Sequence, residues 1–240
     1  MKQYEQVIEV MEKNGGFATL GFLNQNVDVS DWKTKTPFAT IRRIVQDDRF
    51  FFKIRPGLWA LDKYRGQIEE KLHIGKVSGK EEEVFDHTYY QGLLVEIGNI
   101  KGLETFVPNQ DKNKSFLGKP LKEVATLNNI HDFSYQNVVQ KAKTVDVVWF
   151  NHRGFPSSFF EVEYTTDFQN SLLKFTALQD FYAKFYIVSH LGRKRNYQLK
   201  IALDVFRPLK ERVEFIDYDC ISNIHAKSHE LYKLQIETGL

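Results

Sequence analysis

The 240-residue sequence has a single cysteine, Cys220, and this scarcity excludes a fold that depends on disulfide bonds. A lone thiol fits a reducing compartment, and we expect Cys220 to fill a small buried apolar space. Long apolar runs are lacking as well. The first residues, MKQYEQVIEVMEKNGG, mix glutamates into apolar positions, unlike a signal peptide, and no later stretch reaches transmembrane length. The sequence therefore predicts a cytoplasmic protein with no membrane partner.

A strong charge of one sign is also missing, because the formal net charge is only +2. Dedicated nucleic-acid-binding domains are usually more basic, so any basic surface must be local. No glycine-rich phosphate loop, nucleophile elbow or dinucleotide fingerprint occurs, which excludes the common ATPase, hydrolase and dehydrogenase classes. His225 and His229 are spaced i, i+4, but no further ligand is spaced for a closed zinc site, and we expect both side chains to be exposed.

The length permits two domains, and the pattern of the first 64 residues predicts a winged helix. Apolar residues at helical spacing predict a helix over residues 4–14. A second helix is expected after Thr36, which can act as its N-cap, with Pro37 at the first helical position. Residues 50–54 and 58–61 are expected to form a hairpin across an Arg-Pro-Gly turn. Residues 65–84 are charged and poor in periodicity, and we interpret them as a linker to a domain over 85–240.

Candidate DNA contacts lie on and before the second helix. They are Lys33, Lys35, Thr40, Arg42 and Arg43, which fall outside the apolar face of that helix. Residues 4–62, including Asp48-Arg49-Phe50 and Gly57-Leu58-Trp59-Ala60-Leu61, resemble a HARE-HTH-type winged helix. The resemblance implies contact with duplex DNA, although some members of that class bind proteins instead.

The remaining chain alternates helices and strands, which predicts an α/β sandwich with a central mixed sheet. Strands are expected at 104–107, 145–150, 158–164, 185–189 and 213–218. Helices are expected at 87–101, 168–182, 193–206 and 219–235.

Three acidic residues in this domain suggest a metal site. Asp146 lies in an apolar strand, where a buried carboxylate needs a compensating cation. Glu161 and Glu163 point to the same face of the next strand because side chains alternate along a strand. If the two strands are neighbours, the three carboxylates converge into the kind of oxygen-ligand cluster that Mg²⁺ prefers. An E-x-E pattern on a strand is also common as a solvated face or in ion pairs, so this pattern alone leaves catalysis open.

A resemblance over residues 85–220 adds to this reading. Its motifs in chain order are Leu94-Val95-Glu96-Ile97-Gly98, Val107-Pro108-Asn109-Gln110-Asp111, Asp146-Val147-Val148-Trp149, Phe160-Glu161-Val162-Glu163-Tyr164 and Ser171-Leu172-Leu173-Lys174-Phe175. Together they resemble the PD-(D/E)XK restriction-endonuclease-like superfamily. The resemblance implies that Asp146 and Glu161 bind the metal ion, with the carbonyl group of Val162 as a further ligand.

The sequence departs from the commonest pattern of that superfamily at Glu163, where a lysine is expected. In E-x-E members this residue acts as a general base or holds a second metal ion. The sequence therefore leaves open whether the site binds one Mg²⁺ ion or two. Lys174 is a candidate replacement for the missing lysine, against the alternative of a solvated helix lysine. Glu96 resembles the extra helix acid of such nucleases, whereas Asp111 lies in a polar segment typical of turns.

The sequence thus predicts a Mg²⁺-dependent DNA endonuclease of the type II restriction or defence class. Cutting both strands requires two active sites, for which a homodimer is the economical arrangement. The alternative is a non-catalytic DNA-binding or transcription-associated protein with an inactive nuclease fold, and the absence of the E-x-K lysine supports it. The retention of three mutually repelling carboxylates argues against that alternative.

Overall fold

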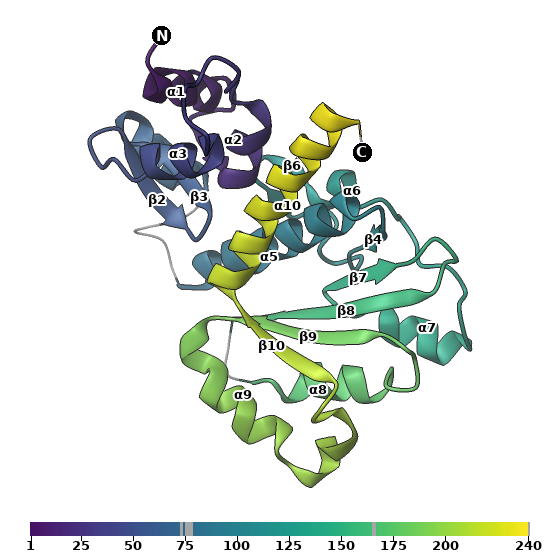
Figure 1. Cartoon of the computed structure of the whole chain (residues 1–240). Helices are drawn as coiled ribbons and strands as arrows, with labels where there is room; N and C mark the ends of the chain where they lie inside the picture. The colour runs from purple at the N-terminus through teal and green to yellow at the C-terminus, as the bar shows by residue number, and fades with distance from the viewer. Residues whose placement is uncertain (73, 75–78, 165–166, 240) are drawn as a thin grey trace. The chain divides into compact units, whose positions relative to one another are not determined.

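The computed structural model describes residues 1–72, 74, 79–164 and 167–239 of the chain (Figure 1). The chain forms two compact units, one made of residues 1–82 together with 222–240 and the other of residues 83–221. In the described ranges, no helix combines the length and apolar character needed to cross a membrane.

The first unit contains helices packed on a small antiparallel sheet. Its elements begin with α1 (Gln3–Lys13), β1 (Phe17–Thr19), α2 (Leu20–Asn26), α3 (Pro37–Ile44), β2 (Phe51–Arg55) and β3 (Leu58–Leu61). The strand order is β1-β3-β2. Thr36 is the N-cap residue of α3 and Pro37 follows it, as predicted, although the Thr36 side chain makes no capping hydrogen bond.

The predicted linker contains regular structure in its described part. Short helices η1 (Asp62–Tyr64) and α4 (Arg65–Lys71) follow β3, and the long helix α5 (Gly79–Ile100) begins inside the predicted linker. The apolar side chain of Ile68 is buried, which explains why α4 packs as a helix rather than remaining extended. Residues 73 and 75–78 of the predicted linker lie outside the described residues.

Most of the C-terminal helix α10 (Tyr218–Thr238) belongs to the first unit, which includes residues 222–240, although the sequence pattern grouped these residues with the second domain. Asn24 Nδ2 donates a hydrogen bond to the Ala226 carbonyl oxygen at 3.3 Å, and Lys233 Nζ donates one to the Val27 carbonyl oxygen at 3.0 Å. Periodicity along the chain cannot identify such partners, because they lie about 200 residues away.

The expectation that His225 and His229 are exposed is wrong. They are only 2% and 8% exposed, and their Nε2 atoms lie 3.0 Å apart. Gly21 of α2 permits this burial, since a Cβ atom there would lie 2.5 Å from His229 Cδ2 and 2.7 Å from His225 Cε1. The close approach of two helices at a glycine therefore buries both imidazole rings.

The second unit is built on a mixed five-stranded sheet of order β10-β9-β8-β7-β4, which confirms the predicted α/β class with a central mixed sheet. The strands are β4 (Glu104–Phe106), β7 (Val147–Phe150), β8 (Pro156–Glu163), β9 (Lys184–Ser189) and β10 (Val213–Asp217). Strands β8, β9 and β10 run parallel, whereas β7 is antiparallel to both β8 and β4. A small hairpin of β5 (Ser115–Phe116) and β6 (Lys119–Pro120) and the short helix α6 (Leu121–Val124) follow β4.

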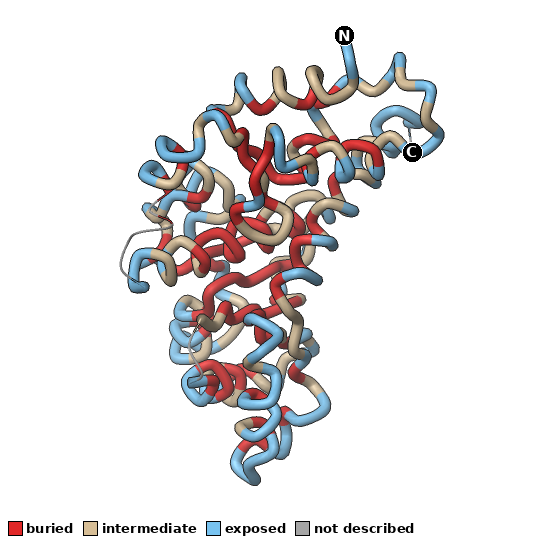
Figure 2. The backbone as a smooth tube through the Cα atoms, turned by 90° about the vertical axis from the view of Figure 1, so that its left-hand side faces the viewer, coloured by how far each residue is buried: buried red, intermediate tan, exposed pale blue. Residues whose placement is uncertain are grey.

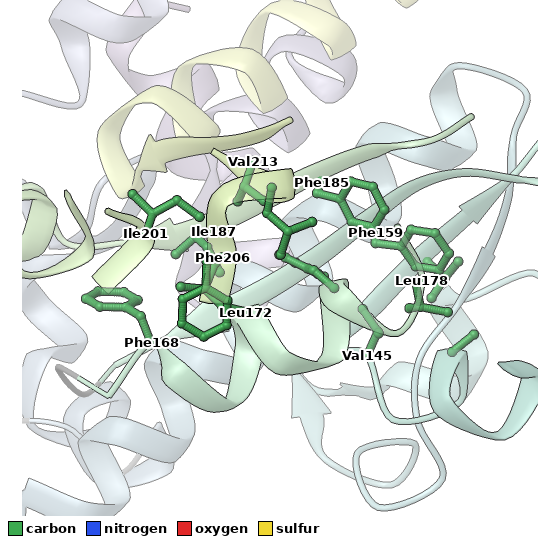
Figure 3. Packing of buried hydrophobic residues seen from close by; sticks show 14 of the residues in the cluster. Val145, Phe159, Phe168, Leu172, Leu178, Phe185, Ile187, Ile201, Phe206 and Val213 are labelled. Carbon is green, nitrogen blue, oxygen red and sulfur yellow. The ribbon is translucent and has the colours of Figure 1, made fainter. Parts of the chain in front are cut away.

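Helices cover both faces of the five-stranded sheet (Figure 1). On one face, Trp149 Nε1 donates a hydrogen bond to the Leu94 carbonyl oxygen of α5 at 3.1 Å. The other face packs against α7 (Gln136–Ala142), α8 (Gln169–Thr176) and α9 (Lys194–Ile201). Phe159, Leu172 and Phe185 are fully buried in this core (Figure 3). Exposed residues, pale blue in Figure 2, gather on loops and on the outer turns of helices.

Two helices of the second unit are shorter than predicted. Helix α8 ends at Thr176 rather than near residue 182, because the guanidinium of Arg212 binds the carbonyl oxygens of Gln179, Phe181 and Ala183. The predicted helix over 193–206 divides into α9 and the 3-10 helix η3 (Asp204–Leu209), following the short 3-10 helix η2 (Leu191–Arg193).

Cys220 is exposed on α10, so the expectation that it is a buried filler is wrong. It lies in the first turn of that helix, where its main-chain N–H binds Asp217 Oδ1 at 2.9 Å.

Candidate active site

The register of β7 and β8 places Asp146 opposite Glu161. The last ladder pair at this end is Val147 with Phe160, and the next antiparallel step along both chains pairs Asp146 with Glu161. Asp146 precedes the first residue of β7 rather than lying inside the strand as predicted. Directly opposed side chains lie about 4.5–5.5 Å apart at Cβ, and two like charges there repel each other. Both residues are buried, Asp146 at 7% and Glu161 at 2% exposure.

Helix α8 supplies the polar partners of the two strand glutamates. Lys174 Nζ lies 2.9 Å from Glu161 Oε1 and 2.8 Å from Glu161 Oε2. Ser171 Oγ lies 3.1 Å from Glu161 Oε2 and also contacts Glu163 Oε1. One hydroxyl proton can serve only one acceptor fully, so both serine contacts are satisfied best when one glutamate carries a proton.

Asp146 is held by groups from α5 and β8. Its Oδ2 atom lies 3.2 Å from His87 Nε2 and accepts a hydrogen bond from the Val162 main-chain N–H at 2.8 Å. The main-chain carbonyl oxygen of Asp146 accepts a hydrogen bond from Gln91 Nε2 at 3.0 Å. The carboxylate and the backbone of this residue are therefore both fixed.

The main chain of Val162 lies at the edge of β8 that faces Asp146. The N–H group of Val162 donates to Asp146 Oδ2, and because the N–H and C=O groups of one strand residue point to the same side, we expect its carbonyl group to face this edge of β8 as well. The carbonyl group of Glu163 points to the opposite side, where Ser189 Oγ and the Tyr218 hydroxyl group donate to it.

Asp111 belongs to this region, although its sequence context suggested only a turn. It is 2% exposed, accepts a hydrogen bond from Gln91 Nε2 at 2.8 Å and pairs with Lys114 Nζ at 2.6 Å. One ligand atom each from His87, Asp111 and Asp146 lie within 4.8 Å of one another. His87 and Asp111 therefore lie beside Asp146 in addition to the predicted set of Asp146, Glu161 and Glu163.

Burial and neighbouring charges shift the pKa values of the acids in opposite directions. Burial opposes ionisation of Asp146, but the hydrogen bond and charge of His87 lower the pKa of Asp146 below its usual range. Burial and the charge of Asp146 raise the pKa of Glu161 well above its usual range, despite the opposing effect of Lys174. Burial raises the pKa of Glu163 to about 7, against the hydrogen bond from Ser171.

The neighbouring acids raise the pKa values of the two basic residues, Lys174 and His87. Burial would lower the pKa of Lys174, but the charges of Glu161 and Asp146 raise it. Burial likewise opposes the charged form of His87, yet its hydrogen bond to Asp146 raises the pKa of the imidazole. Both shifts favour cationic partners beside the buried acids in the metal-free protein.

Glu96 is half-buried on α5, nine residues after His87. Nine helical residues span about 13.5 Å. The backbone of Glu96, the extra helix acid expected from the sequence, is therefore far along α5 from His87, which contacts Asp146. Glu96 is not a member of the group formed by His87, Asp111 and Asp146.

The predicted DNA contacts of the first unit have different environments. Lys33, Lys35, Arg42 and Arg43 are exposed. Arg42 donates a hydrogen bond to Asn223 Oδ1 of α10 at 3.0 Å. Thr40 is only 8% exposed, and its hydroxyl group donates to the Thr36 carbonyl oxygen at 3.1 Å. Its side chain is therefore bonded to the main chain of α3 and is not presented on the surface.

The sequence reading missed His87, Gln91 and Ser171. His87 and Gln91 are spaced i, i+4 on α5, just before the apolar residues 93–95, and this spacing places them on one side of the helix. Polar residues at that spacing were the available signal. Ser171 precedes Lys174 by three residues, so the two face the strand glutamates together.

Comparison with curated proteins and with solved structures gives no match to the chain. The sequence does match one protein family, described as Type II restriction enzyme NmeDI C-terminal domain, over residues 69–238. The matched region includes the whole of the second unit and therefore every acidic residue of the candidate site. Because this match spans well over half of the sequence, the chain belongs to that restriction-enzyme family.

Proposed function

We propose that the chain is a Mg²⁺-dependent DNA endonuclease of the type II restriction class, with a PD-(D/E)XK-like active site. The observation that carries the proposal is the pairing of Lys174 with Glu161 opposite Asp146 in the β7–β8 register. Membership of a restriction-enzyme family supports DNA as the substrate.

The donor groups suit a hard divalent ion. Asp146 and Glu161 offer buried carboxylate oxygens, and burial together with the charge of Asp146 raises the pKa of Glu161, so a bound cation would relieve their repulsion. Carboxylate and carbonyl oxygens are the ligands that Mg²⁺ prefers, and the Val162 carbonyl group points towards the same edge. When bound there, the ion would polarise the scissile phosphate and make water a better nucleophile.

Glu163 and Lys174 take the remaining roles in this proposal. A carboxyl group whose pKa is about 7 exchanges protons near neutral pH, which suits a general base that accepts a proton from the attacking water. Lys174 is held beside Glu161 and would stabilise the negative charge that develops on the phosphate. It thereby replaces the lysine that the E-x-K pattern places at position 163.

DNA positioning is assigned to the first unit, which we propose is a HARE-HTH-like winged helix. The order of helices and strands and the β1-β3-β2 sheet support this assignment. Arg43, Lys33 and Lys35 are exposed near α3 and would contact phosphates or base edges. A homodimer would supply the second active site needed to cut both strands.

The test is Mg²⁺-dependent cleavage of supercoiled plasmid DNA by the wild type, Asp146→Asn and Glu161→Gln. Each substitution keeps the side-chain volume but removes a charged ligand, so cleavage should be lost while DNA binding and folding persist. Relief of repulsion should leave the apo Glu161→Gln protein equally or more stable. Glu214→Gln, an exposed strand glutamate on β10, is the matched control and should cut normally.

Undiminished cleavage by either folded variant would contradict the assignment of the acids. A wild type that binds but never cuts a broad panel of DNA with Mg²⁺ would instead favour a non-catalytic DNA-binding protein.

A further inference from the structure

The group formed by His87, Asp111 and Asp146 contains a nitrogen donor that the proposed Mg²⁺ site lacks. One ligand atom from each residue lies within 4.8 Å of the other two. Asp111 and Asp146 are 2% and 7% exposed, so their carboxylates are largely removed from water. Two buried carboxylates that converge with an imidazole form a mixed nitrogen and oxygen donor set.

The distance between the ligand atoms of His87 and Asp146 suits a shared metal ion as well as a hydrogen bond. His87 Nε2 lies 3.2 Å from Asp146 Oδ2. Two ligand atoms bound about 2.0–2.2 Å from one ion at a right angle lie about 3 Å apart. An ion could therefore replace the shared proton without a large movement of either side chain.

Gln91 holds the acids in place and adds a further donor. Its Nε2 atom binds both Asp111 Oδ2 and the Asp146 carbonyl oxygen, which fixes the two chain segments against α5. Gln91 is fully buried, and its Oε1 atom has no hydrogen-bond partner among the described residues. A flip of this amide would exchange Nε2 for Oε1, so that its hydrogen bonds to the two acid residues give way to a neutral oxygen ligand for the ion that those residues hold.

Lys114 is the cation that such an ion would displace. Its Nζ atom lies 2.6 Å from Asp111 Oδ1, and its side chain is 34% exposed. A partly exposed lysine can move into water at little cost, whereas the buried Asp111 carboxylate cannot.

We propose that His87, Asp111 and Asp146 hold a second divalent ion of the first-row transition series, with Mn²⁺ as its probe. Imidazole favours such ions over Mg²⁺, which prefers oxygen ligands alone. The inference rests on the proposed function in one respect, because Asp146 is a proposed ligand at both sites. The sequence left open whether one or two metal ions are bound. This proposal gives two ions, each with a different set of ligands.

The test is a titration of the metal-free full chain with MnCl₂, followed by electron paramagnetic resonance. Bound Mn²⁺ should show electron spin-echo modulation from an imidazole ¹⁴N nucleus. His87→Asn and His87→Gln should remove that modulation and weaken Mn²⁺ binding by about 10-fold or more, with little change in Mg²⁺ affinity. Lys114→Ala removes the competing cation and should strengthen Mn²⁺ binding.

His131→Asn is the matched control, because His131 Nε2 also lies 3.0 Å from a carboxylate, Glu104 Oε2, but at an exposed pair. It should keep both the modulation and the Mn²⁺ affinity. Thermal melts establish that each variant is folded.

Retained ¹⁴N modulation, or unchanged Mn²⁺ affinity, in both folded His87 variants would overturn the inference. If cleavage by the wild type is Mg²⁺-dependent while this happens, the proposed nuclease function stands alone. If the wild type never cuts DNA but its Mn²⁺ signal depends on His87, the second ion site stands and the nuclease proposal fails.

Discussion

Lys174 Nζ contacts both carboxylate oxygens of Glu161, at 2.9 Å and 2.8 Å, and also lies 2.8 Å from the Thr144 carbonyl oxygen. The lysine therefore ties α8 to β8 and to the turn before β7. In the proposed active site, this lysine would take the place of the lysine that the E-x-K pattern puts at position 163.

Replacement of Lys174 should slow DNA cleavage much more than it destabilises the fold. Lys174→Met keeps the side-chain length and removes the charge, and we expect DNA cleavage to slow by about 10²–10³-fold with DNA affinity nearly unchanged. Stability should fall by less than the about 3–5 kcal/mol of an uncompensated buried charge, because Glu161 can take up a proton. Single-turnover cleavage and thermal melts measure the two effects. Lys122→Ala, at an exposed position on α6, is the control, and wild-type rates in Lys174→Met would return Lys174 to a structural role.

The raised pKa of Glu163 predicts a pH-dependent stability in the metal-free protein. The value rises from 4.5 to about 7 on folding, so between these values the folded state holds more of this proton than the unfolded state does. The unfolding free energy contributed by this group is therefore greatest below pH 4.5 and declines as pH rises to about 7. Glu163→Gln should lack this decline. Melts from pH 4.5 to 8 with a chelator present measure it, and parallel curves for the two proteins would contradict the shift.

Gly21 should be required for the packing of α10 in the first unit. A methyl group at this position would lie 2.5 Å from His229 Cδ2 and 2.7 Å from His225 Cε1. Gly21→Ala should therefore destabilise the protein by about 1–3 kcal/mol through overpacking. Gly66→Ala, on α4 with nothing within 4 Å, is the control and should be neutral or stabilising because alanine favours helix. Equal melting temperatures for the two variants would argue against close packing at Gly21.

Arg42 and Arg43 should contribute to DNA binding in unequal degree. Both are exposed on α3, but Arg42 already binds Asn223, so the loss of Arg43 should weaken binding more. The double alanine variant should lower the salt dependence, by up to about 2 in the slope of log K against log salt. Arg49→Ala is the control, since Arg49 is paired with Asp47 at 2.6 Å. Filter-binding titrations at several salt concentrations provide the measurement, and an unchanged slope would remove this face of α3 from the DNA contacts.

Local pattern in the sequence was enough to predict the mixed sheet and the positions of its strands. Alternation of side chains along β8 requires Glu161 and Glu163 to share a face, and the contacts of Ser171 with both glutamates fit that requirement. Helical spacing likewise brought Ser171 and Lys174 to one side of α8. These relations depend only on residues close in the chain, which is why they could be read without coordinates.

Tertiary structure decided which distant groups meet. His87 and Gln91 reach Asp146 from more than 50 residues away, and burial then turns Asp111 from a turn residue into part of a donor group. The same holds in the first unit, where Gly21 meets His225 and His229 across about 200 residues. Periodicity reports which face of an element is apolar, but the partner of that face is set by packing and by the satisfaction of buried polar groups. Burial also raises the pKa of Glu163 to about 7, a property that no sequence pattern carries.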